Sequence, residues 1–209
     1  MVFRFIFINK LILSVALMLM ISNASSAQDY SAEAKFKVPI GKNETQLTVT
    51  KAIDGDTLKL SNGKKVRLIG IDTPESTNNP KTRRDSSRTG QDIRNIMVMG
   101  KKAKEFCKEV VEGKNVRLEY DVQERDRYGR LLAYVYIMTD VPNLSAVQLE
   151  KDNALYYVPG EKFMEIFLNA TLVKAGYAQI MTIPPNVKYQ DLFLKLQQEA
   201  REHKRGFWA

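Results

Sequence analysis

The sequence predicts an α+β fold with a mainly β core, a small antiparallel barrel of five strands with about three helices packed on it. Two observations predict this fold. Short segments of alternating apolar residues occupy the first two thirds of the chain, and helical periodicity lies between and after them. Closure of the sheet removes the exposed edges of short strands, so this order favours a barrel. Because no internal repeat or low-complexity linker is visible, we expect one folded domain.

The N-terminus has the pattern of a secretory signal peptide. Arg4 and Lys10 precede or flank an apolar run, Leu11–Ile21, and small residues lie before Gln28. The run is shorter than the roughly 20 residues that a membrane span takes. We expect cleavage and a secreted or periplasmic protein without stable membrane association; a retained N-terminal anchor is the alternative. The chain then divides into a signal peptide (1–27), a mature N-terminal segment (28–44) and the folded domain (45–209).

Three strands are expected to form a meander at the start of the domain. They cover Thr45–Ile53, Thr57–Leu60 and Lys65–Ile71, and Asp- and Gly-containing turns separate them. Asp56 and Arg67 therefore lie on neighbouring strands. Asp72 begins the loop that follows the third strand.

A basic loop and a helix follow. Ser76–Arg88 holds three arginines and one lysine but no hydrophobic period, which predicts a mobile loop. Apolar residues recur at intervals of three and four from Gln91 to Glu112, as on one face of a helix. Gly100 interrupts this pattern, so the firm helix is expected to begin near Lys101.

The rest of the domain contains the last two strands and two more helices. Val116–Tyr120 and Leu131–Ile137 alternate as strands, whereas Glu161–Lys174 and Gln190–Lys204 have helical periodicity. A proline-containing segment, Ile183–Asn186, separates the two helices.

Composition excludes several kinds of chemistry. The net charge is +8, and +6 once residues 1–27 are removed, which attracts polyanions without identifying a reaction. Cys107 is the only cysteine, so no intrachain disulfide forms, and its apolar helical surroundings predict a buried structural thiol. His203 is the only histidine, which excludes a pair of histidines and a zinc site with several imidazoles. Carboxylates, arginines, water and metal remain.

Acids and arginines are grouped in three blocks. These are Asp54-Gly55-Asp56-Thr57, Arg67 with Asp72-Thr73-Pro74-Glu75, and Asp126-Arg127-Tyr128-Gly129-Arg130. Acidic oxygens suit a hard divalent cation, and guanidinium groups match phosphate oxygens. Together the blocks indicate phosphodiester chemistry. Taken singly, Asp54 and Asp56 are also ordinary turn formers, and Arg130 is also a surface partner for Asp126.

The three blocks, in this order and with the ending Gly206-Phe207-Trp208, resemble the staphylococcal nuclease (thermonuclease) family. The likeness extends over Leu47–Trp208, nearly the whole mature chain. It implies a secreted domain with a five-stranded OB-fold barrel and three helices.

The resemblance also implies one calcium ion, held by Asp56, Asp72 and the backbone carbonyl of Thr73, with Asp54 supporting them from behind. Two direct carboxylates leave much of a calcium shell of about 6 to 8 oxygens to water and substrate phosphate. Metal binding is therefore expected to be loose without nucleotide.

Three further residues are assigned catalytic roles by the resemblance. Glu75 orients or deprotonates the attacking water, while Arg67 and Arg130 hold the scissile phosphate and favour its more charged transition state. The expected products of DNA and RNA hydrolysis end in 3′-phosphate. The expected enzyme is a monomer that prefers single-stranded or frayed nucleic acid.

Two other functions remain open: a catalytically silent nucleic-acid-binding module on the same barrel, and a secreted calcium-dependent protein that binds another acidic ligand.

The sequence departs from the family beside this site. The family carries base-stacking tyrosines after Gly176, but here the run Tyr177–Pro184 holds only one tyrosine, so the aromatic wall is thinned. Tyr128 remains as an expected contact, and Tyr189 is the candidate substitute. The stretches 76–99 and 139–160 are longer than usual, and Leu155–Val158 in the second predicts an added strand or hairpin. The expected substrate contacts are Tyr128, Arg127, Lys81, Arg83, Arg84 and Tyr189.

Overall fold

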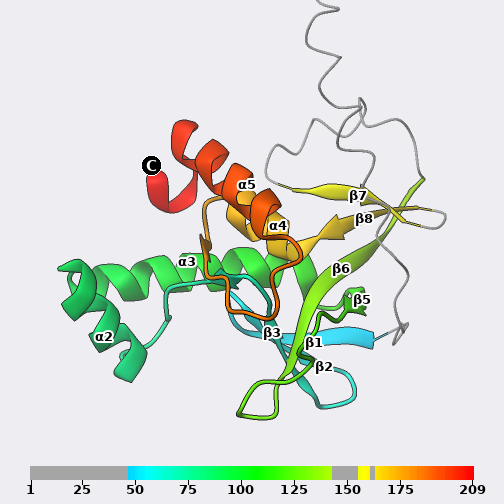
Figure 1. Ribbon diagram of the computed structural model, residues 1–209, viewed down its shortest axis with the longest axis horizontal. Helices are drawn as coiled ribbons and strands as arrows, with labels where there is room; N and C mark the ends of the chain where they lie inside the picture. The colour runs from blue at the N-terminus through cyan, green and yellow to red at the C-terminus, as the bar shows by residue number, and fades with distance from the viewer. Residues whose placement is uncertain (1–46, 143–154, 161–162) are drawn as a thin grey trace, which may run out of the picture. The chain divides into compact units, whose positions relative to one another are not determined.

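A closed barrel of five strands forms the centre of the computed structural model, which describes residues 47–142, 155–160 and 163–209 (Figure 1). The expected signal peptide and the segment 28–44 lie outside the described residues. The strand order β3-β2-β1-β5-β6 closes through a pairing of β3 with β6. The strands of the barrel are β1 (Leu47–Asp54), β2 (Thr57–Leu60), β3 (Lys65–Leu68), β5 (Asn115–Glu119) and β6 (Leu131–Pro142). The predicted OB-type barrel is confirmed.

One pair of strands in the barrel is parallel. β1–β2, β2–β3, β1–β5 and β5–β6 are antiparallel, but β3 and β6 run in the same direction, with Val66 opposite Leu131 and Leu68 opposite Ala133. The prediction of antiparallel pairing throughout is wrong here, because the chain passes through two helices and β5 before β6 reaches the side of β3. This closure carries the turn before β6, which contains Arg130, to the side of Arg67.

Alternating apolar residues fill the barrel, and helix α3 (Ile93–Val111) covers it beside β1. Val49, Leu58 and Val66 are fully buried on successive strands. The face of α3 that meets the barrel includes Cys107, which is completely buried, as predicted.

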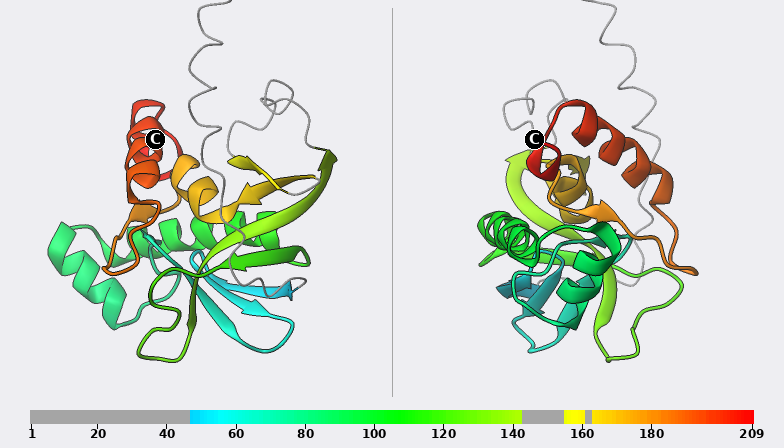
Figure 2. Two further views of the ribbon diagram at one scale, coloured as in Figure 1. Left: turned by 45° about the vertical axis from the view of Figure 1, so that its right-hand side comes forward. Right: turned by 90° about the vertical axis from the view of Figure 1, so that its left-hand side faces the viewer.

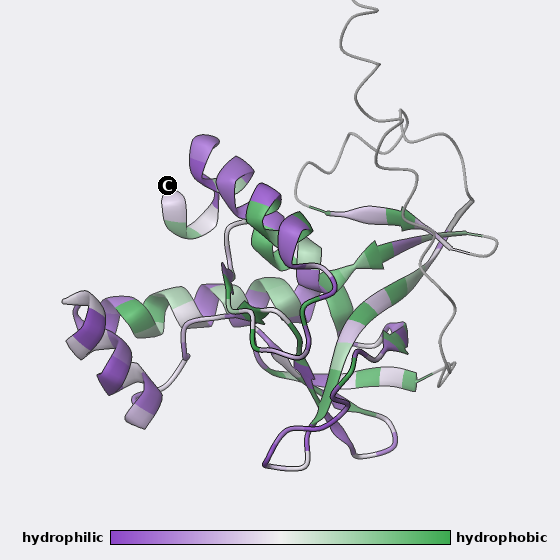
Figure 3. Cartoon of the chain, viewed as in Figure 1, coloured by the Kyte–Doolittle hydropathy of each residue, from purple (hydrophilic) through white to green (hydrophobic). Residues whose placement is uncertain are grey.

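Helix α2 (Pro80–Thr89) replaces the predicted loop between Ser76 and Arg88. The Asn79 side chain accepts hydrogen bonds from the backbone of Lys81 and Thr82, and Pro80 occupies the first helical position. Gly90 ends the helix with φ 71°. The loop prediction was wrong because caps and packing against α3 define this helix, which is hydrophilic on nearly every side (Figure 3).

Helix α3 begins at Ile93 rather than near Lys101, so Gly100 lies inside it. A Cβ atom at Gly100 would lie 2.2 Å from the backbone oxygen of Glu75. The glycine therefore marks a close approach between α3 and the segment 74–75, not the start of a helix.

The segment predicted as one helix, Glu161–Lys174, is a strand followed by a helix. β8 (Phe163–Phe167) pairs with β6 on one side and with β7 (Tyr157–Pro159) on the other, and α4 (Leu168–Lys174) follows. The long β6 continues beyond the barrel and offers backbone partners that a helix could not use. β7 also bears out the expectation of an added strand, although residues 143–154 of this stretch lie outside the description.

The remaining elements connect the barrel to the C-terminus. β4 (Ile71–Asp72) is separated from β3 by a turn at Gly70 and pairs with β9 (Gln179–Ile180). α5 (Gln190–Glu202) packs against α4, and a short 3-10 helix, η3 (Gly206–Trp208), follows (Figure 2). The described residues thus hold four α-helices rather than about three. None of these helices combines the length and the apolar character needed to cross a membrane.

Candidate active site

An open cleft of about 430 Å³ lies at one mouth of the barrel, within the usual size range of ligand sites. Its walls come from β1, β2, β3, β4, α2, the turn before β6 and the segment after β9. The lining residues are Ile53, Asp54, Asp56, Thr57, Lys65, Arg67, Asp72, Glu75, Lys81, Arg84, Tyr128, Arg130 and Met181.

Asp56 is the most deeply buried acid of the cleft, with 5% of its surface exposed. Its Oδ2 accepts hydrogen bonds from the backbone N–H of Thr73 at 2.8 Å and from the Thr73 hydroxyl at 2.9 Å. Burial alone would raise the pKa of Asp56, but Arg67, Lys81 and these hydrogen bonds outweigh it and lower the pKa. Asp56 is therefore a carboxylate at neutral pH.

Asp54 also lines the cleft, and it has a different partner from Asp56. Its Oδ1 accepts a hydrogen bond from the Ser76 hydroxyl at 2.8 Å. Burial, followed by repulsion from Glu75 and Asp56, raises the pKa of Asp54 even though Ser76 and Lys104 act in the opposite direction.

Arg67, which lies on β3, bridges two of the acids. Its Nη2 donates to Asp72 Oδ1 at 2.7 Å, and its Nη1 is in ion-pair contact with Asp56 Oδ2. Burial would lower the pKa of Arg67, but the two aspartates reverse that effect and raise it. The guanidinium thus fixes the separation of the two carboxylates predicted to hold the metal.

Lys81, in the first turn of α2, contacts three oxygens, one of which is also the partner of Arg67. Its Nζ lies 2.9 Å from Asp72 Oδ1, 3.0 Å from the backbone oxygen of Thr73 and 3.0 Å from Glu75 Oε1. Asn79, the cap of the same helix, donates to Glu75 Oε2 at 2.7 Å. Both carboxylate oxygens of Glu75 are therefore held by α2. Burial would lower the pKa of Lys81, but Asp72 and the other acids raise it, which keeps the ammonium charged.

Arg130 enters the cleft from the turn before β6. Asp126 accepts hydrogen bonds from Arg130 Nε at 2.6 Å and from its backbone N–H at 2.9 Å. Burial alone would raise the pKa of Asp126, but these bonds and a hydrogen bond from the backbone of Tyr128 outweigh it and lower the pKa. Tyr128 is 68% exposed at the tip of this turn, and its ring centroid lies 4.8 Å from Cζ of Arg127. Cζ of Arg130 also lies over this ring, at 5.6 Å, so the turn presents an exposed tyrosine together with guanidinium groups.

The structure brings most of the predicted site residues to one cleft. All the predicted catalytic side chains line it, and so do the expected acidic ligands, Lys81, Arg84 and Tyr128. Arg83 instead donates to Asn78 on the exposed side of α2, and Arg127 lies on the turn outside the lining.

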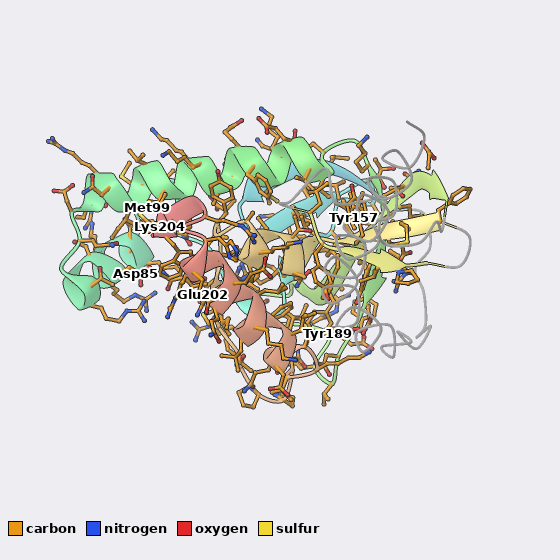
Figure 4. All side chains as sticks on the ribbon, turned by 90° about the horizontal axis from the view of Figure 1, so that it is seen from above. Asp85, Met99, Tyr157, Tyr189, Glu202 and Lys204 are labelled. Carbon is orange, nitrogen blue, oxygen red and sulfur yellow. The ribbon has the colours of Figure 1, made fainter. Side chains whose placement is uncertain are left out.

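Tyr189 is also outside the cleft. Its hydroxyl donates to Glu119 at 3.1 Å and accepts from Tyr136 at 3.0 Å, and its ring packs edge-on against Tyr134 in the core. Figure 4 shows Tyr189 well apart from Asp85 of α2. A side chain held in this way has no free face for a base, so the expectation of a substitute stacking residue does not agree with its position. Tyr177 likewise packs against Phe106 and Phe207.

Sequence reasoning missed three residues of the site. Lys65 and Met181 line the cleft, and Asn79 holds Glu75. The Asn-Pro pair that starts α2 could have identified Asn79 as a helix cap. No sequence signal pointed to Met181, which supplies an apolar wall near the position where tyrosines were expected.

The donor atoms at this end of the cleft suit a hard cation. The oxygens of Asp72, Thr73 and Glu75 already converge on one positive charge, and oxygen is the ligand atom that calcium prefers. Among the described residues, no group of three or more acidic, histidine or cysteine side chains is arranged to hold a metal ion.

Comparison with known proteins agrees with the geometry. The family model described as "Staphylococcal nuclease homologue" matches residues 65–209. The chain belongs to the staphylococcal nuclease family. A thermonuclease of Staphylococcus hyicus is 32% identical over 170 residues, which cover 80% of this chain and 78% of the relative.

Two further relatives of the staphylococcal nuclease family support the assignment. The endonuclease YncB of Bacillus subtilis (strain 168) is 33% identical over 198 residues, 90% of this chain and 75% of the relative. A thermonuclease of Staphylococcus intermedius is 32% identical over 163 residues, 77% of this chain and 74% of the relative. At the level of the family, the activity is that of a nuclease, a hydrolase whose substrate is nucleic acid.

Proposed function

We propose that this member of the family is a calcium-dependent phosphodiesterase that hydrolyses DNA and RNA and leaves 3′-phosphate ends. The observation that carries the proposal is the convergence of Glu75, Arg67 and Arg130 with the oxygens of Asp56 and Asp72 in one cleft. A turn-forming role for the two aspartates gives no reason for both arginines and the glutamate to face them.

Asp56, Asp72 and the carbonyl of Thr73 would hold the calcium ion, with Asp54 behind them. The ion would supply positive charge to a phosphate oxygen and lower the repulsion that an attacking water meets. The side chains of the site would supply the remaining catalytic functions.

Glu75 would orient the attacking water and accept its proton. Its two oxygens have fixed partners, Asn79 and Lys81, so the carboxylate starts from a defined position. Arg67 and Arg130 approach from β3 and from the turn before β6, and a phosphate between them would gain more from both guanidinium groups as its charge grows. Neither arginine is a proton donor, because a guanidinium group stays protonated in proteins.

The substrate would be bound through phosphate and sugar rather than through base edges. Lys65, Arg84 and Arg130 offer cations along the cleft, and Tyr128 offers the exposed aromatic ring. Phosphate contacts carry no sequence information, which agrees with action on both DNA and RNA. An exposed aromatic ring favours single-stranded or frayed segments.

We further propose a monomer that is exported after cleavage before Gln28. Mass spectrometry of the mature N-terminus tests that cleavage.

Hydrolysis of denatured DNA and of RNA tests the proposal directly. With millimolar calcium at alkaline pH, the purified protein should degrade both substrates, chelation of calcium should stop the reaction, and end-group analysis should find 3′-phosphate. Intact substrate with calcium present would overturn the enzymatic proposal. Tight binding without cleavage would favour a silent nucleic-acid-binding module, and absence of both would favour a calcium-dependent protein for another acidic ligand.

A further inference from the structure

Lys81 stands at a position where the rules of helix stability disfavour it. It is the second residue of α2, and the first turn of that helix has no acidic residue. The partial positive charge at a helix N-terminus repels an ammonium group. An unfavourable local choice of this kind is expected where a side chain has a function elsewhere.

Contacts with the oxygens of the site offset the unfavourable position of Lys81 in the helix. Its ammonium lies within 3.0 Å of three oxygens, Asp72 Oδ1, the carbonyl of Thr73 and Glu75 Oε1. The first two belong to residues proposed to bind calcium, and the third belongs to the proposed base. Arg83 and Arg88 of the same helix contact Asn78 and Asp85 instead. The ammonium is therefore placed on the metal-binding oxygens themselves, not merely near them.

We propose that Lys81 is a built-in cation that occupies the metal-binding oxygens in the metal-free protein, must leave them when a divalent cation binds, and so sets the affinity for that cation. This inference rests on the proposed function, because it takes the same oxygens as the metal site. It assigns Lys81 a role in metal affinity beyond the substrate contact expected from the sequence.

Physical competition follows from the geometry. A calcium ion binds oxygens at about 2.3–2.6 Å, so an ion on Asp72 and Thr73 would meet an ammonium that contacts the same two atoms. Two positive charges at that separation repel each other strongly in a partly buried site. Metal binding then includes the cost of breaking the contacts of Lys81, and the released side chain becomes available to substrate phosphate.

The fold is expected to tolerate the loss of this lysine. Arg67 still bridges Asp56 and Asp72, and Asn79 still caps α2 and holds Glu75. Lys81→Met keeps a long side chain with good helix propensity and removes only the charge. Lys81→Gln retains a hydrogen-bond donor without the charge, and circular dichroism verifies that both variants are folded.

Calcium binding without nucleic acid is the decisive measurement. Isothermal titration calorimetry of the full chain should show that Lys81→Met binds calcium about tenfold more tightly than the wild type, with Lys81→Gln between them. Arg88→Met removes the same charge from the exposed last turn of α2 and should change the affinity by less than about twofold. Thermal unfolding gives a second readout: Lys81→Met should gain more stability from calcium than the wild type gains.

The outcomes separate the inference from the proposed function. Equal or weaker calcium binding by Lys81→Met, with binding by the wild type, would overturn the role of Lys81 and leave the calcium site standing. No calcium binding by any variant would overturn both. If binding tightens, the calcium concentration for half-maximal nuclease activity should fall while KM for DNA rises, a divergence that a merely structural residue would not produce.

Discussion

Glu75 illustrates at the scale of one residue how the site is prepared before any ligand arrives. One oxygen accepts from Asn79 and the other contacts Lys81, and both partners belong to the first turn of α2. A carboxylate with both oxygens held loses little further conformational freedom when it orients a water molecule. Part of the conformational entropy of the side chain has already been lost on folding.

Replacement of Glu75 by Gln tests its proposed role. The amide keeps the size of the side chain but cannot accept a proton, so turnover should fall by about 10²–10⁴-fold, the usual contribution of a general base. The affinity for an oligonucleotide with calcium should persist, because the proposed metal ligands and both arginines remain. Single-turnover kinetics and equilibrium binding measure the two quantities.

The matched control is Glu109→Gln, which removes one acid from the exposed face of α3 and should leave both quantities unchanged. Parallel losses of turnover and binding in Glu75→Gln would assign Glu75 to substrate or metal binding instead of proton transfer.

Single residues of the cleft were predictable to different degrees. Asp56, Arg67, Asp72, Glu75 and Arg130 stand in motifs, and their chemical types alone indicated a phosphate and a cation. The contacts of Lys81 were not predictable, because they depend on a helix that has no hydrophobic period. Tyr189 was misplaced because sequence does not show whether an aromatic ring faces a ligand or the core.

Helix α3 influences the site at the scale of an element. Gly100 allows its backbone to approach Pro74 and Glu75 so closely that a Cβ atom would lie 2.2 Å from the oxygen of Glu75. That oxygen belongs to the backbone and cannot rotate away. The segment that carries the proposed base is therefore supported by α3 from behind, while α2 holds its side chain.

Gly100→Ala should destabilise the protein although alanine favours a helix. The propensity gain is about 1 kcal/mol, but the added methyl group would push against the 74–75 backbone, and overpacking of this kind costs about 1–3 kcal/mol. We expect lower stability in urea and lower turnover, since Glu75 moves with its backbone. Val98→Ala, at a position that is 52% exposed on the same helix, should leave turnover unchanged. A stabilised, fully active Gly100→Ala variant would contradict the support assigned to α3.

The elements themselves were predicted where periodicity was strong. The meander, β5, the start of β6 and most of α3 and α5 followed their patterns. α2 was missed because its caps rather than an apolar stripe define it, and β8 was assigned to a helix because its backbone partner is the far part of β6. That pairing places Tyr136 opposite Phe167. The local sequence pattern does not reveal a pairing between residues so far apart along the chain.

At the scale of the whole described domain, barrel closure unites residues that are distant in sequence. The parallel β3–β6 pair places the Arg130 turn beside β3, and β4 pairs with β9, which brings the segment of Met181 to the same cleft. The family resemblance predicted a site at one mouth of a barrel but neither of these two pairings, while composition alone gave only the sign of the charge. The cleft is thus a product of the closed barrel and of the helix packed behind it.

Cys107 reports on that packing and gives a last prediction. It is completely buried between α3 and the barrel, and burial, followed by the carboxylates of Asp56 and Glu112, raises the pKa of its thiol. A thiol-specific reagent needs an exposed thiolate, so labelling of the native protein should be slow and should become immediate in denaturant. If α3 moves away from the barrel, Gly100 also loses its close approach to the backbone of Glu75. Labelling and loss of nuclease activity should therefore proceed at the same rate, and calcium with a bound nucleotide should slow both by stabilising the folded state. Rapid labelling of a fully active protein would show that α3 opens without disturbing the site.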